Sequence, residues 1–199
     1  MFFIITLLGL SFNIYAQTFT LLPKSSLEFK IPYTMGTHEG SSQKIGGSVT
    51  IGEQGEFSLP IKSLKTDDEK MNCHLYEALG LNYKNSSFPD EHVCEDNKLP
   101  ESGNDAIVYP KISYSVTKSN ILNATQDEFE LELEGYWKIH GQKKNESFKI
   151  KLIKDQNRWS SQKSIKIHLS DFDIIVKNFL FISVEDTVSV KLSLFWSQS

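Results

Sequence analysis

Apolar and polar residues alternate along most of this chain, and this alternation constrains the fold more than any other feature. Successive side chains of a β-strand point to opposite faces, so each alternating run predicts a strand with one apolar and one polar face. The run that begins at Leu27 is typical, because Leu27, Phe29 and Ile31 alternate with polar residues. About eight such runs follow one another, at residues 27–35, 45–51, 57–64, 112–116, 129–139, 148–152, 165–169 and 188–194.

One segment has helical spacing instead. Residues 67–79 predict a short amphipathic helix, with Thr66 as the N-cap and Glu69 completing a capping box. Gly80 is expected to end this helix. Residues 36–43 carry two glycines and several polar side chains, and they predict a turn between the first two strands. The apolar positions of the helix are Met71, Leu75, Ala78 and Leu79.

Residues 80–106 show neither strand nor helix spacing, and they predict a long irregular loop. Such a loop is unusual in a compact domain unless it is functional or tied down. The chain has two cysteines, Cys73 in the predicted helix and Cys94 in the loop. In an exported protein an even count favours a disulfide, which would fold the loop back over the helix. Two free thiols, or a metal pair involving His74 and His92, are the alternatives.

The N-terminus resembles a signal peptide. Residues 2–14 are nearly continuously apolar, yet this stretch is short for a bilayer-spanning helix. Ala16 supplies a small residue before a cleavage point. We therefore expect residues 1–16 to be a signal peptide and residues 17–199 to form the mature domain, which would be periplasmic or secreted. A buried first strand and an uncleaved anchor are the alternatives.

No repeat or linker divides the mature chain, so a single domain is expected. Strands that pair with their sequence neighbours and carry one polar face fit a closed antiparallel barrel. The predicted fold is therefore all-β, a closed antiparallel eight-stranded barrel with one short helix and a long loop. A two-sheet sandwich is the alternative.

The apolar faces of these strands predict the barrel interior, and no full charge belongs to it. An eight-stranded barrel is wide enough either to be filled by side chains or to hold one small ligand. The sequence alone leaves both readings open. The predicted inward residues are Phe29, Ile31, Tyr33, Val49, Phe57, Leu59, Ile112, Tyr114, Leu131, Trp137, Ile150, Ile167, Val190 and Leu192.

Composition and motifs argue against several function classes. The formal net charge is -4 and the pI about 5.8, which disfavours a nucleic-acid partner. The chain contains no nucleophile elbow, phosphate loop or dinucleotide fingerprint. Its five histidines are scattered without metal-ligand spacing, so neither a metal nor a cofactor is expected. The histidines are His38, His74, His92, His140 and His168.

Several segments, taken in order, carry a likeness to a known family. They are Ser26–Phe29 with Gly36–Gly40, Ile45–Val49, Ser63–Lys70 with His74-Leu75, Tyr109–Tyr114, Leu169–Phe172 and Glu185–Val190. Together they resemble the YceI family of lipocalin-like exported proteins, which are linked to polyisoprenoid binding, and the likeness spans almost the whole mature chain. In this family the stretch before His74 is usually different, and the segment between His74 and Tyr109 is shorter.

This resemblance implies an open lumen and a non-catalytic function. The ligand would be an apolar small molecule, a polyisoprenoid or another lipid, held by the predicted inward residues. Tyr33 and Trp137 are amphipathic, so they could line the cavity and offer polar tips to a head group. The alternatives are a small exported stress-related enzyme that uses the segment 80–106, and a filled barrel that binds a protein partner.

Overall fold

Antiparallel strands dominate the computed structural model, which describes residues 17–176 and 183–199. The predicted signal peptide, residues 1–16, lies outside the described residues. The strands are β1 (Thr18–Leu21), β2 (Ser26–Tyr33), β3 (Gly36–Ser42), β4 (Gly46–Thr50), β5 (Gly55–Pro60), β6 (Lys65–Thr66), β7 (Lys111–Ala124), β8 (Glu128–Ile139), β9 (Gln142–Asp155), β10 (Arg158–His168) and β11 (Thr187–Gln198). One α-helix, α1 (Glu69–Gly80), and two short 3₁₀ turns, Ile61–Ser63 and Leu169–Phe172, accompany them.

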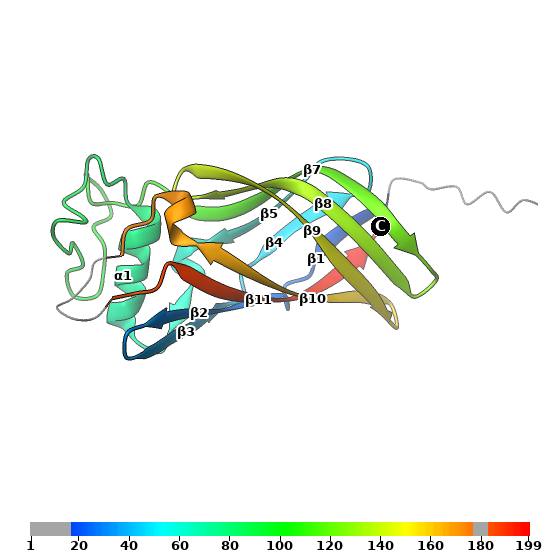
Figure 1. Ribbon diagram of the computed structural model, residues 1–199, viewed down its shortest axis with the longest axis horizontal. Coiled ribbons are helices and arrows are strands. Elements are labelled where there is room, and N and C mark those ends of the chain that lie inside the picture. Colours follow the sequence, from blue (N-terminus) through cyan, green and yellow to red (C-terminus); the bar gives the residue numbers. More distant parts are fainter. Residues whose placement is uncertain (1–16, 177–182) are drawn as a thin grey trace, which may run out of the picture.

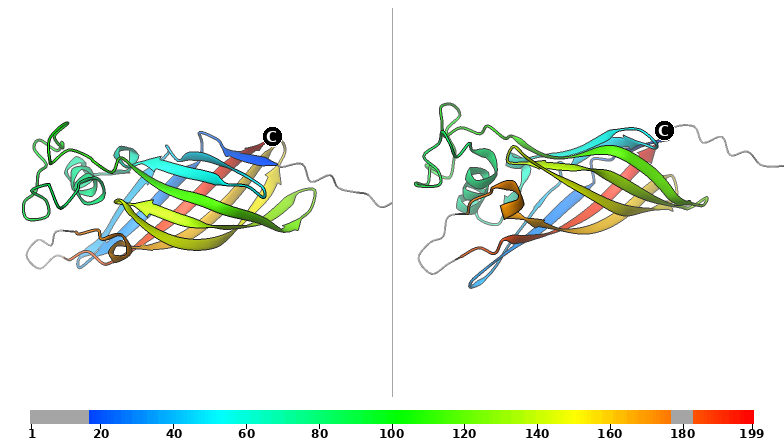
Figure 2. Two further views of the ribbon diagram at one scale, coloured as in Figure 1. Left: turned by 90° about the horizontal axis from the view of Figure 1, so that it is seen from above. Right: turned by 45° about the horizontal axis from the view of Figure 1, so that its top comes forward.

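The sheet closes on itself. Its order is β1-β4-β5-β7-β8-β9-β10-β11, and β1 also pairs with β11, which completes a ring of eight strands. Strands β2 and β3 extend this wall at the end where α1 lies (Figure 1). The closure confirms the predicted antiparallel eight-stranded barrel. Figure 2 shows its tilted strands surrounding an elongated interior.

Three strands were not predicted, namely β1, β3 and the two-residue β6. The segment 36–43, expected to be a turn, is mostly strand β3, which pairs with β2 from Gly36 to Ser42. It lacks the apolar residues that reveal alternation, and a side chain on Gly40 would collide with the Phe29 ring packed over it. Strand β1 was also missed because it is short and directly follows the apolar N-terminus.

The helix starts later than predicted and has a different cap. Its N-cap is Asp68, whose carboxylate accepts a hydrogen bond from the backbone N–H two residues on. Thr66 belongs to β6 and donates its hydroxyl to the Asp68 carbonyl oxygen instead. Gly80 is the last helical residue. A β-carbon at this position would lie 2.6 Å from Ile61 Cδ1. The glycine therefore permits close packing of the helix on the barrel.

Helix α1 lies across one end of the barrel, and the segment 81–110 folds back over it (Figure 1). A disulfide joins Cys73 of the helix to Cys94 of this segment, with their Cα atoms 6.1 Å apart, so the predicted bridge is confirmed. Among the described residues, no helix has the length and apolar character needed to span a bilayer. We call α1 together with residues 81–110 the lid.

The opposite end of the barrel is filled by aromatic side chains. The Phe19 and Phe129 ring centroids lie 5.6 Å apart, and Trp159 packs against both at 6.0 and 5.0 Å. All three contacts are edge-on, the arrangement that aromatic pairs prefer. These three residues fill this end of the interior as part of the solid core, and we call them the aromatic plug.

Strands β9 and β10 are paired over only a short part of the barrel wall. These strands pair over only three positions beside their hairpin, from Arg158↔Asp155 to Ser160↔Ile153. By contrast, β10 pairs with β11 over ten positions. Both Figure 1 and Figure 2 show β9 and β10 diverging from this hairpin towards the lid end.

Glu77 holds the lid together. Its side chain is fully buried, and Oε2 lies 2.8 Å from Nδ1 of both His74 and His92. Its other oxygen, Oε1, accepts hydrogen bonds from the backbone N–H groups of Val93 at 2.6 Å and Cys94 at 3.0 Å. Three of these contacts, to His92, Val93 and Cys94, fix the loop to the helix beside the disulfide, and the fourth joins Glu77 to His74 of the helix itself.

These contacts make the lid sensitive to acid. Burial alone raises the pKa of Glu77, but hydrogen bonds from His74, His92 and Val93 outweigh it, so the pKa lies below the ordinary 4.5. A carboxyl group whose pKa is lowered by folding stabilises the native state above its unfolded pKa. That stabilisation is lost as the pH falls through the folded pKa.

We therefore expect Glu77→Gln to lower the melting temperature at pH 7 by several degrees. The reason is that loss of a buried, charged acceptor costs about 1–3 kcal/mol. The difference from the wild type should begin to shrink as the pH falls below the ordinary carboxyl pKa of 4.5, because the unfolded wild type then takes up a proton at Glu77. Glu91→Gln, at an exposed carboxylate of the same loop, is the matched control and should melt like the wild type. Thermal melts across pH 3–7 check this, and a deficit that stays constant to pH 3 would contradict it.

Candidate functional site

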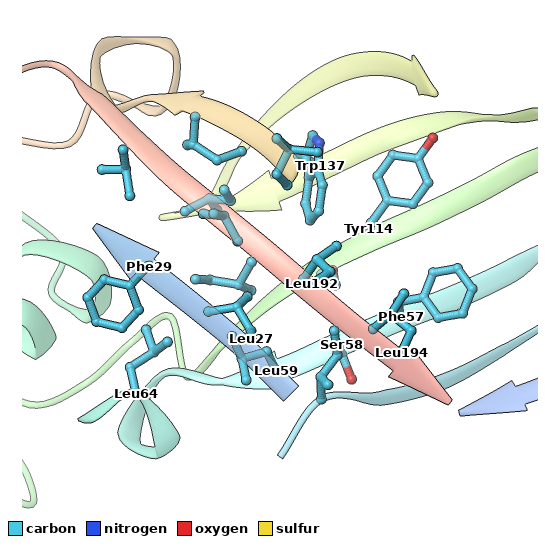
Figure 3. A pocket seen from close by; sticks show the side chains of 18 of the residues that line it. Leu27, Phe29, Phe57, Ser58, Leu59, Leu64, Tyr114, Trp137, Leu192 and Leu194 are labelled. Carbon is cyan, nitrogen blue, oxygen red and sulfur yellow. The ribbon is translucent and has the colours of Figure 1, made fainter. Parts of the chain in front are cut away.

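A cavity occupies the lid half of the barrel (Figure 3). The cavity has a volume of about 140 Å³. Its walls come from most barrel strands, and Leu75 and Leu79 of α1 close it from the lid side. The remaining lining residues are Leu21, Leu27, Phe29, Ile31, Ile45, Phe57, Ser58, Leu59, Leu64, Ile112, Ser113, Tyr114, Leu133, Trp137, Ile139, Phe148, Ile150, Ile165, Ile167, Leu169, Ile174, Val188, Val190, Leu192, Leu194 and Trp196.

The surface of this cavity is apolar throughout. No charged residue of the described part of the chain lines it, and Ser58 and Ser113 are the small polar lining residues. A polar ligand group placed here would lose its water without gaining a partner, which costs several kcal/mol. The site therefore suits a hydrocarbon and disfavours a polar molecule.

The polar atoms of the lining aromatic residues are bound within the wall. The Tyr114 hydroxyl donates to the backbone carbonyl of Glu146 at 2.8 Å and lies 3.1 Å from that of Leu133. The Trp137 indole N–H donates to the Glu146 carboxylate at 2.8 Å, and that of Trp196 donates to Ser161 Oγ at 2.9 Å. The rings consequently present carbon to the cavity, as Figure 3 shows for Tyr114 and Trp137.

Tyr114 has no free acid or base function. Burial raises the pKa of its hydroxyl well above the ordinary 10, and the nearby carboxylates of Glu146 and Glu134 raise it further. Gly135 allows this placement, because a β-carbon there would lie 3.0 Å from the Tyr114 ring and would collide with the Ser115 carbonyl. The side chain therefore serves as neutral wall.

Eleven of the fourteen residues predicted to face inward and hold the ligand line the cavity. The other three do not, for two physical reasons. Val49 and Leu131 are almost completely buried in the solid half of the interior, towards the aromatic plug. Tyr33 stacks on His38 in the β2–β3 hairpin, with ring centroids 4.3 Å apart. The eleven are Phe29, Ile31, Phe57, Leu59, Ile112, Tyr114, Trp137, Ile150, Ile167, Val190 and Leu192.

The predicted polar tip of Trp137 is already engaged, because Glu146 binds its indole N–H. Tyr33 also lies outside the lining. Neither residue offers a head group a free polar atom from inside the cavity. The sequence reasoning also missed the lid side of the lining, Leu64, Leu75 and Leu79, although the helical spacing had already marked Leu75 and Leu79 as an apolar face that needs a partner.

One cluster has the composition of a metal site. His74, Glu77 and His92 place their ligand atoms within 4.8 Å of one another, and among the described residues no other such group occurs. However, both Glu77 oxygens are taken up by the two histidines and two backbone N–H groups. The cluster is therefore explained by its role in fixing the lid.

The wall role of Tyr114 leads to a prediction. We expect Tyr114→Phe to cost about 1 kcal/mol of stability, because one hydroxyl hydrogen bond is lost. The ring would still face the cavity, so the affinity for an apolar fluorescent probe should stay within about twofold. Thermal melts and probe titrations check both outcomes. A loss of probe binding without a loss of stability would mean that the hydroxyl contacts the ligand.

Comparison with known proteins places this geometry in a family. The model of the YceI-like domain matches residues 20–195. One similar solved structure is described as a polyisoprenoid binding domain from Saccharophagus degradans implicated in plant cell wall breakdown. It is 12% identical, with a TM-score of 0.63 over 90% of this chain and 97% of that chain. BcnA from Burkholderia cenocepacia is 14% identical, with a TM-score of 0.61 over 88% and 98%.

At these identities the two structures establish the likeness of fold. No curated protein matches the sequence. The family match, however, covers the barrel from β1 into β11 and includes the lid. The chain therefore belongs to the YceI-like domain family.

Proposed function

We propose that this protein binds an apolar, chain-like lipid, isoprenoid-like in character, inside its barrel and acts as a non-catalytic carrier or store. The observation that carries the proposal is the lid-side cavity, whose surface is apolar while the polar atoms of its aromatic walls are bound elsewhere. The similar Saccharophagus degradans domain is described as polyisoprenoid-binding, which supports the same ligand class.

The magnitude of apolar burial is adequate for this function. A chain that buries roughly 400 Å² gains about 10 kcal/mol at ~25 cal/mol per Å². Part of that gain offsets the freedom lost on binding, which costs at least about 4 kcal/mol. Such a ligand needs few polar contacts, and the cavity offers few.

The chemistry of the cavity supports a binding role over catalysis. Acid–base and nucleophilic mechanisms need titratable side chains within reach of the substrate. Among the lining residues that the structure describes, only Tyr114 has a titratable side chain, and its hydroxyl is held by backbone carbonyls. The His74–Glu77–His92 cluster lies in the lid and is not among the lining residues.

Filling the cavity tests the proposal. Leu192 points into the cavity from β11 (Figure 3), so Leu192→Trp should occupy ligand space and weaken binding of an apolar fluorescent probe by at least about tenfold. Its melting temperature should stay near that of the wild type, because an existing void takes up the added atoms. The matched control is Leu152→Trp in the solid half, where overpacking costs about 1–3 kcal/mol.

The two substitutions should therefore separate binding from stability. Leu192→Trp should weaken probe binding and melt normally, and Leu152→Trp should melt at a lower temperature. If Leu192→Trp melted as low as the control and the folded protein still bound the probe with full affinity, the binding site would not be this cavity.

We further propose that the protein is exported and cleaved after Ala16. Strand β1 begins at Thr18, whose N–H donates to the Ser199 carbonyl oxygen, so this cut leaves the barrel seam intact. The Cys73–Cys94 disulfide suits an oxidising compartment. N-terminal sequencing of the protein from its own host should begin at Gln17, and finding Met1 on the exported protein would overturn the proposed cleavage.

A further inference from the structure

Lys163 occupies an inward-facing position of the barrel. In β10 the residues that face inward alternate, and Ser161, Ile165 and Ile167 pair across to Leu194, Val190 and Val188, which line the cavity. Lys163 lies within this series and pairs with Leu192, another lining residue. It is a partly buried cation on the face that is otherwise apolar.

Lys163 also lines an opening in the barrel wall. Where β9 and β10 have separated, a second hollow lies between them, with a volume of about 570 Å³. Phe148 and Ile165 line both this hollow and the apolar cavity, so the two adjoin. We call this opening the β9–β10 slot. Its remaining lining residues are Glu132, Glu146, Ser147, Lys149, Lys163, Ser164 and Lys166.

The charge of Lys163 is not neutralised within the described part of the chain. Its ammonium lies 5.7 Å from the centroid of the Phe148 ring, and no carboxylate there forms an ion pair with it. Glu146, the acidic residue on the same inner face, receives the Trp137 N–H. A partly desolvated cation without a counter-charge is unfavourable, so an external anion would stabilise it.

The slot is the place where a bound lipid could reach polar surroundings. The aromatic plug closes one end of the interior, and Leu75 and Leu79 of the lid face the cavity at the other. Lys149 and Lys166, on the outer rim, add positive charge beside Glu132. Three lysines against two glutamates leave the slot with a net charge of +1.

We propose that the β9–β10 slot binds the anionic head group of a lipid, a carboxylate or a phosphate, whose chain lies in the cavity. Lys163 contacts the anion from the inner face, and Lys149 and Lys166 attract it from the rim. This inference rests on the proposed function, because it assumes that the chain binds in the cavity.

The experiment compares a charged probe with its neutral counterpart. Parinaric acid, a fluorescent polyene fatty acid, and its methyl ester are titrated into the intact protein at low ionic strength. Lys163→Gln should weaken binding of the acid roughly tenfold, the effect of losing about 1.4 kcal/mol from a charge-assisted contact. The ester should bind the variant and the wild type alike, and Lys163→Arg should restore the acid.

Lys138→Gln is the matched control. Lys138 is an exposed lysine of β8 outside the slot and should leave both affinities unchanged. If Lys163→Gln left the affinity for the acid unchanged while both probes bound the wild type, the head-group site would be wrong and the proposed function intact. If neither probe bound the folded wild type, the proposed function itself would fail.

Competition identifies the anion. Dodecyl phosphate, dodecanoate and dodecanol share a chain, so differences in their displacement of the bound ester report the head group. Stronger displacement by the phosphate assigns a phosphate lipid, and stronger displacement by dodecanoate assigns a fatty acid. Equal displacement by all three would overturn an anionic site.

A labelling experiment tests the position independently. Both native cysteines form the disulfide, so a cysteine introduced at Ser164 is the single free thiol. Attaching a bulky polyethylene glycol maleimide there should slow association of parinaric acid in stopped flow. The same label at Ser41→Cys, on the exposed face of β3, should not. Equal rates for both labelled proteins would show that the slot is not the route of the ligand.

Discussion

The pairing of the last strand with three other strands holds the barrel together. Strand β11 pairs along one edge with β10, and along the other edge first with β2 and then with β1. The chain between β2 and β1 bends at Ser25, a fully buried residue whose hydroxyl accepts from the Phe195 N–H at 3.0 Å and lies 3.2 Å from the Phe195 carbonyl oxygen. Without this anchored bend, β1 could not also reach β4, and the sheet would remain open with unpaired edges.

Closure of the sheet produces an interior that is solid in one half and hollow in the other. At the hairpin end, Phe19, Phe129 and Trp159 fill the space with large rings in edge-on contact. At the lid end most lining residues are branched aliphatic side chains, and the aromatic rings of Tyr114 and Trp137 are drawn to the wall by hydrogen bonds. A cavity can persist there because the plug, the Ser25 bend and the Glu77 contacts fix the surrounding backbone without filling it.

The alternation of residue types was sufficient to predict the closed barrel and most of the lining, since a buried face in a strand must recur every second residue. The prediction from alternation failed where a strand carries no apolar side chains to mark its buried face. Strand β3 carries glycine and polar residues, so it looked like a turn. Alternation also says which face a residue occupies but not how far along the barrel it lies, and Val49 and Leu131 consequently belong to the solid half. Glu77 was missed because three of its four partners come from fifteen or more positions further along the chain.

The charged side chains of Glu77 and Lys163 are both at least partly shielded from water, but their surroundings differ. Glu77 is completely buried, and the fold supplies it with two histidines and two backbone N–H groups. Its charge is thus accounted for by the architecture of the lid. Lys163 faces inward among aliphatic residues, and an aromatic ring is the partner that the described chain gives it. A leucine or isoleucine at this position would continue the apolar face without the free-energy cost of burying a cation. The lysine is therefore best explained by an external anion that pairs with its charge.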